Sequence, residues 1–104
     1  MITVNVLYGD SPDSTFDMDY YLKKHMPMVG EKLGTALKGM SVEQGLRGAQ
    51  PGTAATVFRV LATLQFDSVD AFERAFAPVA NDILGDIPRY TNIAPTIQIS
   101  EVKL

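Results

Sequence analysis

Residues 54–66 read AATVFRVLATLQF, and this stretch decides the fold. It is rich in β-branched and aromatic residues, follows a loop that contains glycine and proline, and ends at the turn-forming pair Asp67 and Ser68. Such a run predicts a β-strand, and it is the most clearly marked strand in the chain. The elements on either side of this strand then set the architecture.

Three further segments predict strands. Apolar Ile2, Val4, Val6 and Tyr8 recur at the period of two expected for a strand, and the turn-forming residues 9–14 follow them. A weaker alternation runs through residues 40–46, and residues 97–102 provide a last strand. The chain therefore contains four predicted strands.

Two segments show the helical period instead. From about residue 17, inward-facing side chains recur at three- and four-residue spacing: Met18, Leu22, His25, Val29, Leu33 and Ala36. The pair Asp67-Ser68 offers the N-cap of a second helix, and an apolar stripe follows it: Val69, Phe72, Phe76, Val79 and Ala80. Residues 81–95 contain two prolines and predict a long connection to the last strand.

The predicted order is strand, helix, strand, strand, helix, strand. Two right-handed strand–helix–strand units in this order fold as a ferredoxin-like α+β sandwich, in which both helices cover one face of an antiparallel sheet. We expect residues 1–104 to form this one domain. The other face would carry Val57 and Leu61, with Leu7 beside them, so we expect it to pack against the sheet of a second copy.

Composition excludes several function classes. The chain has 104 residues, 46% of them hydrophobic, and a formal net charge of −3. No basic run is longer than Lys23-Lys24, so no nucleic-acid partner is expected. Without cysteine the chain has no disulfide and no thiolate site. The pattern of a signal peptide and apolar stretches of membrane-spanning length are both missing, so we expect a cytoplasmic protein that does not associate with membranes.

Residues 20–28, YYLKKHMPM, hold the only histidine of the chain. Pro27 removes a helical hydrogen bond and crowds the preceding turn, so the helix should be disturbed beside His25, and space should open between helix and sheet. Burial would lower the pKa of His25 and favour the neutral imidazole, which can accept a proton. The residues alone leave two interpretations open, a general acid or base and a histidine that only fills the core.

Other chemistry is less well marked. One histidine without cysteine cannot form a histidine-rich metal site, and we expect no cofactor, although one histidine would suffice to hold a haem. Arg59, in the middle of the strand 54–66, would either hold an anionic ligand or form an ion pair, for example with Glu43. The ion pair is the favoured interpretation.

Two motifs at opposite ends of the chain resemble the EthD family, which is named for a protein of ethyl tert-butyl ether degradation. The first is Tyr20-Tyr21 followed by His25-x-Pro27. The second is the segment 86–95, DIPRYTNIAP, with 97–102, IQISEV, after it. The resemblance spans nearly the whole chain. At position 92 the family more often carries an aspartate, where this chain has asparagine.

The resemblance implies a dimeric α/β-barrel built from two ferredoxin-like subunits joined through their sheets. Relatives of the superfamily include cofactor-independent monooxygenases, polyketide cyclases, decarboxylases, muconolactone isomerases and haem-degrading enzymes, with pockets between helices and sheet. We therefore predict a small cofactor-independent enzyme for an apolar or aromatic carbonyl-bearing metabolite. His25 would be its general acid or base, and the substrate would contact Tyr21, Met26, Met28 and Tyr90. The alternative is a non-catalytic dimer that carries a hydrophobic ligand or assists an oxidase.

Overall fold

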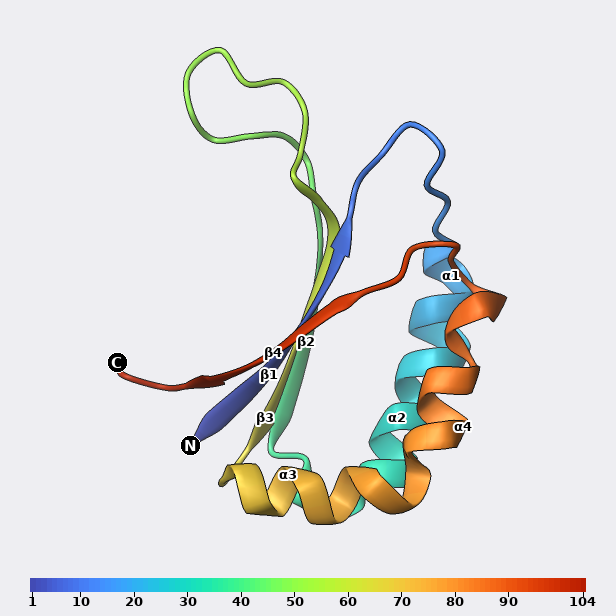
Figure 1. Ribbon diagram of the computed structural model, residues 1–104, viewed down its shortest axis with the longest axis vertical. Helices are drawn as coiled ribbons and strands as arrows, with labels where there is room; N and C mark the ends of the chain where they lie inside the picture. Colours follow the sequence, from blue (N-terminus) through green and yellow to red (C-terminus); the bar gives the residue numbers. More distant parts are fainter.

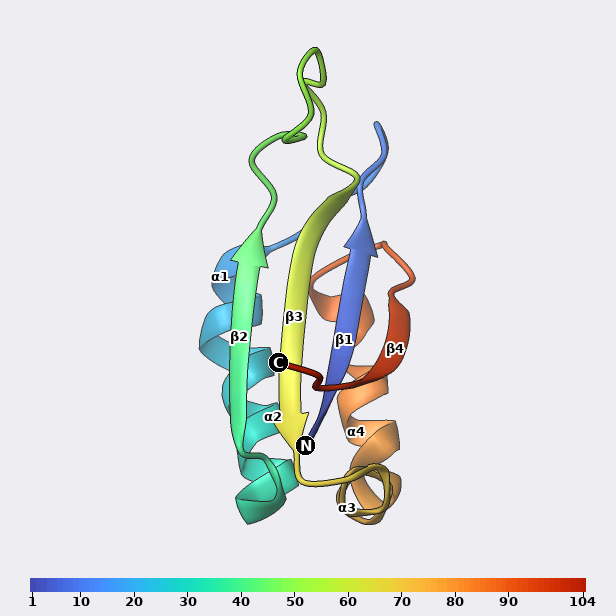
Figure 2. The same ribbon diagram turned by 90° about the vertical axis from the view of Figure 1, so that its left-hand side faces the viewer.

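The strand predicted first lies inside a four-stranded antiparallel sheet, in the order β2-β3-β1-β4 (Figures 1 and 2). The computed structural model describes residues 1–104. The strands are β1 (Ile2–Gly9), β2 (Gly39–Gln44), β3 (Phe58–Phe66) and β4 (Thr96–Glu101). With β1 and β3 as its two central strands, the sheet has the ferredoxin-like arrangement, and the predicted α+β fold is confirmed.

Both helical segments cover the same face of the sheet (Figure 1). None of the helices is both long and apolar enough to cross a bilayer. The first segment consists of α1 (Met18–Tyr20), the π-helical turn η1 (Tyr21–His25), α2 (Met26–Leu33) and the 3-10 turn η2 (Gly34–Ala36). The second consists of α3 (Val69–Phe76), η3 (Ala77–Val79), α4 (Ala80–Gly85) and η4 (Ile87–Arg89).

The prediction of a long connection over residues 81–95 was wrong, because helical structure continues through α4 and η4. The prediction took Pro88 as part of an irregular connection. Pro88 instead lies at the start of the 3-10 turn η4, where the missing N–H has no intrahelical partner to lose. Proline at this position is compatible with a new turn, so the second helical segment reaches to Arg89.

Strand β3 is shorter than predicted and begins at Phe58. Its neighbours explain the difference, because β1 ends at Gly9 and β2 at Gln44, so residues 54–57 have no strand to pair with. Val57 lies outside the sheet and is 74% exposed. The expectation that Val57 belongs to the open sheet face is therefore corrected.

The core lies between the sheet and the helices. Alternate residues of β3 point into it, from Val60 through Ala62 and Leu64 to Phe66, and all four are buried. Ile2, Val4 and Tyr8 of β1 lie beside them. The helical segments contribute Tyr21, Met26, Val29, Leu33 and Ile83, and Tyr90, which follows η4, completes the buried apolar set.

The open face of the sheet is more polar than the sequence led us to expect. Leu7 and Leu61 are directly paired on it and are partly exposed. Around them the strand register places mostly polar side chains: Thr3, Asn5, Ser41, Glu43, Arg59, Thr63, Gln65, Thr96, Gln98 and Ser100. The misjudgement came from assigning faces within β3 without the registers of its neighbours. A small apolar centre, not a broad apolar face, is what a second copy would cover.

Candidate functional site

The site begins with an irregular turn in the first helical segment. Residues Tyr21–His25 form a π-helical turn, which closes when the N–H of Met26 donates to the carbonyl of Tyr21. Pro27 follows at the start of α2. The predicted disturbance near Pro27 is therefore present as a π-helical turn, a feature that often marks functional sites.

This turn changes which side chains face the sheet. Tyr21 and His25 are both buried, while Leu22 is 49% exposed. The regular helical period had placed Leu22 on the inner face, and that expectation is corrected. The π-helical turn contains more residues per turn than an α-helix, so the regular period does not carry through it. The imidazole of His25 and the ring of Tyr21 stack, with centroids 5.4 Å apart and planes 14° apart.

His25 joins the two helical segments through its ring nitrogens. Its side chain is buried, and Nδ1 lies 2.9 Å from Oδ2 of Asp86, which follows α4. Nε2 lies 3.4 Å from the hydroxyl of Tyr90. Asp86 was part of the motif recognised in the sequence, but it was not predicted to be a site residue. The separation of 61 residues between the two partners explains this omission, since no local pattern marks such a pair.

Asp86 has further partners on its other oxygen. The hydroxyl of Tyr20 donates to Oδ1 at 2.8 Å, and Nε of Arg89 lies 3.5 Å from the same atom. Burial alone would raise the pKa of Asp86, but the contacts with His25, Tyr20 and Arg89 outweigh it and lower the pKa below its ordinary value. Asp86 is thus an ionised carboxylate at neutral pH and can only accept hydrogen bonds.

The charge state of His25 follows from its surroundings. Burial lowers the pKa of His25, and the neighbouring Asp86 opposes this effect only in part. The imidazole is therefore neutral at pH 7. Since the Asp86 carboxylate is an acceptor, Nδ1 must carry the proton and donate it. Nε2 is left with the lone pair that a general base requires, and its one partner is the Tyr90 hydroxyl at 3.4 Å.

Phenols surround the imidazole. The hydroxyls of Tyr8 and Tyr90 are 2.6 Å apart, and the ring of Tyr90 lies 4.6 Å from that of His25. Burial raises the pKa of Tyr8, Tyr21 and Tyr90, so all three phenols stay protonated at neutral pH. Tyr8 was predicted only as an inward residue of the first strand, because strand alternation gives its direction and nothing about its partner.

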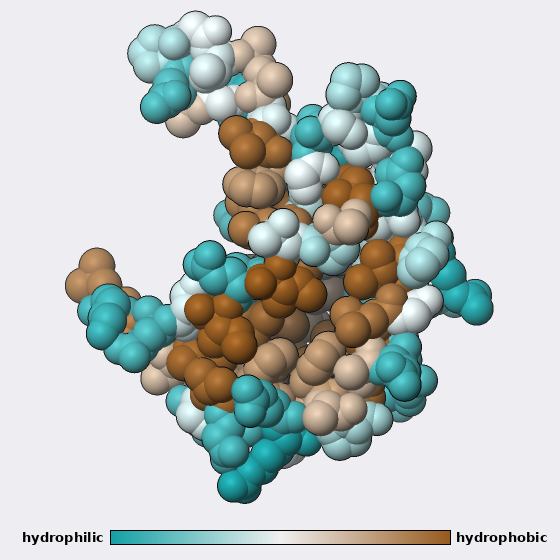
Figure 3. Space-filling view, viewed as in Figure 1, coloured by the Kyte–Doolittle hydropathy of each residue, from teal (hydrophilic) through white to brown (hydrophobic).

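A cavity of about 90 Å³ lies beside this cluster, between sheet and helices. His25 is one of its sixteen lining residues, and the other fifteen are apolar or aromatic. Leu84 of α4 and Ile97 of β4 line it while remaining 42% and 49% exposed, so the cavity opens between these elements. Figure 3 shows the hollow there, with hydrophobic residues around it. No group of three His, Cys, Asp or Glu side chains is placed to hold a metal ion.

The predicted site residues fall into three positions. His25, Tyr21 and Met26 line the cavity. Tyr90 is buried and touches His25 without lining the cavity. Met28 is half-buried on α2, packs against the core and does not line the cavity. The structure thus brings four of the five predicted residues together and adds Asp86 and Tyr8 to them.

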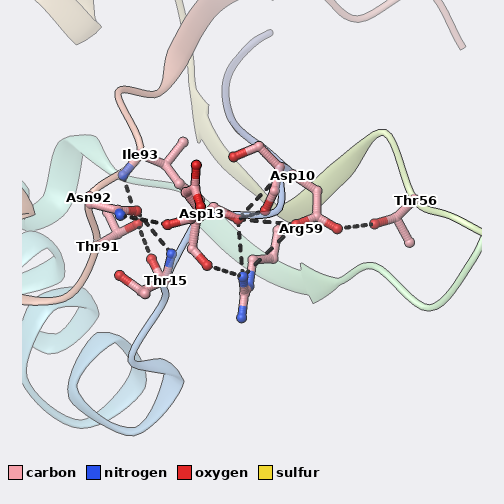
Figure 4. Close-up of polar contacts among 10 residues, drawn as sticks. Asp10, Asp13, Thr15, Thr56, Arg59, Thr91, Asn92 and Ile93 are labelled. Atoms are coloured by element: carbon pink, nitrogen blue, oxygen red, sulfur yellow. Dashed lines mark hydrogen bonds and ion pairs between the residues drawn. The ribbon is translucent and has the colours of Figure 1, made fainter.

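Arg59 takes part in a different polar cluster, at the end of the sheet (Figure 4). Its Nη1 donates to the carbonyl of Ser14 at 2.7 Å and lies 3.9 Å from a carboxylate oxygen of Asp10. The suggested ion pair with Glu43 is therefore wrong, although the favoured ion-pair interpretation holds. The partner comes from the loop after β1, whose path is not evident from the sequence.

The side chain of Asn92 also binds the loop between β1 and α1 (Figure 4). Its side-chain oxygen accepts from the N–H of Thr15 at 2.9 Å, and its side-chain nitrogen donates to the carbonyl of Asp13 at 2.9 Å. An ionised aspartate could make the first bond but not the second, because it has no hydrogen to donate. The asparagine that departs from the family pattern therefore has a structural role in this chain.

The pair His25 and Asp86 predicts how stability depends on pH. We expect the free energy of unfolding to fall as the pH drops below about 6.5, the ordinary pKa of histidine. Because the pKa of His25 is lowered in the folded state, the unfolded chain takes up the proton first. The lowered pKa of Asp86 adds a second decline, below its ordinary value of 3.8.

Urea unfolding at about pH 7 and about pH 5.5 measures the first decline. The variant His25→Gln should lose this decline, because glutamine does not titrate. An equally steep fall in stability of wild type and variant would show that His25 does not cause it.

Comparison with solved structures identifies relatives. An EthD-like protein from Ralstonia eutropha JMP134 is 43% identical, with a TM-score of 0.92, over 99% of this chain and 92% of that protein. An EthD family protein from Bacillus halodurans C-125 is 16% identical, with a TM-score of 0.68, over 99% of each chain. A dimeric protein of unknown function from Bacteroides fragilis NCTC 9343, described as having a ferredoxin-like fold, is 13% identical, with a TM-score of 0.59, over 97% of this chain and 95% of that one.

Neither protein-family models nor curated proteins gave a match. The two distant structures support the fold alone, since their sequence identity is low. The relative from Ralstonia eutropha has both high identity and nearly complete coverage. On that basis, this chain belongs to the EthD family.

Proposed function

We propose that this protein is a small acid–base enzyme for an uncharged, apolar or aromatic metabolite that bears a carbonyl group. One observation carries the proposal: the only histidine of the chain borders an apolar cavity and is oriented by a partly buried aspartate. A histidine that merely filled the core would need no cavity beside it. A carboxylate behind a neutral imidazole is also the arrangement that prepares a general base.

The chemistry would start with proton removal next to the carbonyl. Nε2 of His25 would take the proton from the carbon, the C–H bonding electrons would move into the carbonyl, and an enolate would form. Asp86 would stabilise the resulting imidazolium through the existing 2.9 Å contact. The contact of Nε2 with Tyr90 is long, at 3.4 Å, so a ligand would displace a weak partner.

The enolate would then determine the outcome. Return of the proton to another carbon gives an isomer, and attack on a second carbonyl of the same molecule gives a ring. With dioxygen as the co-reactant, an electron-rich enolate or phenolate is also a route to oxygenation without a cofactor. The residues described here favour the shared first step and do not select among the products.

A carrier of hydrophobic ligands is the second candidate. It is favoured by the nearly complete apolar lining of the cavity and by the absence of any enclosed side-chain polar atom that lacks a partner. A screen of carbonyl-bearing metabolites with the purified protein, with and without dioxygen, distinguishes the two. Conversion of a bound compound supports the enzyme, while compounds that bind and are recovered unchanged support the carrier.

We also propose that two copies associate through the open faces of their sheets. Leu7 and Leu61 form an exposed apolar pair in the centre of this face, and full burial of such a side chain stabilises by about 1.5–3 kcal/mol. The similar structure from Bacteroides fragilis is described as dimeric. A sheet-to-sheet contact would leave the cavity on the helical side of each subunit.

Light scattering at micromolar concentration should therefore report about twice the chain mass of 11.3 kDa. The variant Leu61→Asp should halve this value, because it would bury a carboxylate in the interface. The matched control is Leu22→Asp, which puts the same charge on an exposed position of the helical side and should remain dimeric. A wild-type mass of one chain, or a dimeric Leu61→Asp variant, would refute the proposed interface.

A further inference from the structure

We infer that the ligand of the cavity carries its polar group at one end of an otherwise unsubstituted apolar tail, and does not carry polar groups along its length. This inference names a narrower substrate class for the proposed function, and it rests on that function for the placement of the carbonyl group beside His25. It follows from the distribution of polar and apolar side chains along the cavity.

The cavity is elongated. Its floor includes Val4, Val6 and Tyr8 of β1, and a rise of about 3.3 Å per residue puts Tyr8 about 13 Å from Val4. Its opposite wall reaches from His25 to Leu33, which a helical rise of about 1.5 Å per residue separates by about 12 Å. Because α2 runs in roughly the opposite direction to β1 (Figure 1), Tyr8 and His25 share one end of the cavity, and Val4 and Leu33 share the other.

Nitrogen and oxygen atoms of side chains occur at only one of these ends. Among the lining residues, only His25, Tyr8 and Tyr21 carry such atoms. The ring of Tyr21 stacks on His25, with centroids 5.4 Å apart, and its hydroxyl is hydrogen-bonded to Tyr8. The three residues therefore form one cluster at the His25 end. All the other lining residues are alanine, valine, leucine, isoleucine, methionine or phenylalanine.

The far end of the cavity therefore suits only apolar groups. Val4 and Leu64 are paired there in the sheet, and Leu33 ends α2. A hydroxyl or a second carbonyl buried at this end would lose its water without gaining a hydrogen-bond donor, which is costly. A methylene group has no such loss, and each one that the cavity encloses should tighten binding about fourfold.

The mouth of the cavity extends the apolar surface. Leu84 and Ile97 line the cavity while they remain half exposed, and Ile99 lies next to Ile97 on the same face of β4 and is 43% exposed. Registers place Ile97 opposite Val6 and Ile99 opposite Val4, so these side chains follow the cavity towards its far end. A tail that is too long for the enclosed space would still lie against apolar side chains.

The test uses ketones and needs no turnover. Calorimetric titration of wild type with 2-butanone, 2-hexanone and 2-octanone should show affinity rising about fourfold for each methylene. The isomer 4-octanone has the same composition but a carbonyl in mid-chain, so it should bind about fivefold more weakly than 2-octanone, the loss of one neutral hydrogen bond. The compound 2,7-octanedione places a second carbonyl among apolar side chains and should also bind more weakly than 2-octanone.

Two variants locate the tail. Ile97→Ala removes apolar surface beside the tail and should weaken 2-octanone more than 2-butanone. The control Leu22→Ala changes an exposed residue that does not line the cavity, and it should affect neither ketone. Equal binding of 2-octanone and 4-octanone, a dione that binds as tightly as 2-octanone, no gain with chain length, or no binding of any ketone would overturn the inference.

Failure of this inference is distinguishable from failure of the proposed function. If the metabolite screen finds turnover of a compound with oxygen atoms along its whole length, the acid–base proposal stands and the inferred ligand class is wrong. If 2-octanone binds as expected and the screen finds no turnover, the ligand class stands and the carrier is favoured.

Discussion

Replacing His25 by alanine should lower kcat about 10²–10⁴-fold on any substrate that the screen identifies, the usual contribution of a positioned general acid or base. The neutral imidazole is the one basic group that lines the cavity, and its Nε2 has only the long contact with Tyr90. KM should change much less, because the apolar wall that would bind the substrate remains. Steady-state kinetics of both proteins measures the two effects separately.

Two variants make this result interpretable. Leu22 lies in the same π-helical turn as His25 and is exposed. The variant Leu22→Ala should therefore keep full activity. Asp86→Asn should reduce kcat less than His25→Ala, because it removes the group that orients His25 and leaves the base in place. Turnover that survives in a folded His25→Ala variant would remove His25 from the chemistry and favour the carrier.

Replacing Phe66 by alanine should lower the free energy of unfolding by about 3–5 kcal/mol. Phe66 ends β3, is completely buried, and packs edge-to-face on Phe72 of α3, with ring centroids 5.1 Å apart. The substitution would leave a void between the sheet and the second helical segment. The total free energy of unfolding of a small domain is only about 5–15 kcal/mol, so this single change should remove a large part of the stability.

Urea unfolding of the variant and of wild type gives the difference directly. Val57→Ala is the control, since Val57 lies next to the same strand but outside the sheet, and it should change stability by no more than about 0.5 kcal/mol. If Phe66→Ala fails to fold, Phe66→Leu should show a smaller loss at the same position. A loss below about 1 kcal/mol in Phe66→Ala would contradict the packing described here.

The order of the elements could be predicted from the sequence because each has a local signal. Alternation marked β1, β-branched and aromatic residues marked β3, and Ser68 of the predicted cap pair caps α3 with its side chain. The errors arose where a neighbour decides the structure. β3 begins only where β1 and β2 can pair with it, and Pro88 stands at the start of a turn that continues the preceding helix α4.

The site could be predicted only in part, for the same reason. His25 stood out as a single histidine on an apolar face, and Pro27 indicated irregular structure beside it. Asp86 is distant from His25 in the sequence and reaches it through the packing of the second helical segment, and Tyr8 of β1 joins the cluster through Tyr90. Their side chains have no local pattern that pairs them with a histidine. The cytoplasmic location and the independence from cofactors stay predictions.

The central claim is that His25 is a neutral base whose Nε2 accepts from the bound ligand in place of Tyr90. Nitrogen NMR on protein labelled only in histidine tests it most directly, because the chain contains one imidazole. We predict a proton on Nδ1 at neutral pH, a titration midpoint below the ordinary value of 6.5, and a shift of the Nε2 signal when a carbonyl-bearing ligand found by the screen is added. A proton on Nε2, or an imidazole signal that does not respond to a ligand whose binding calorimetry has shown, would contradict the account.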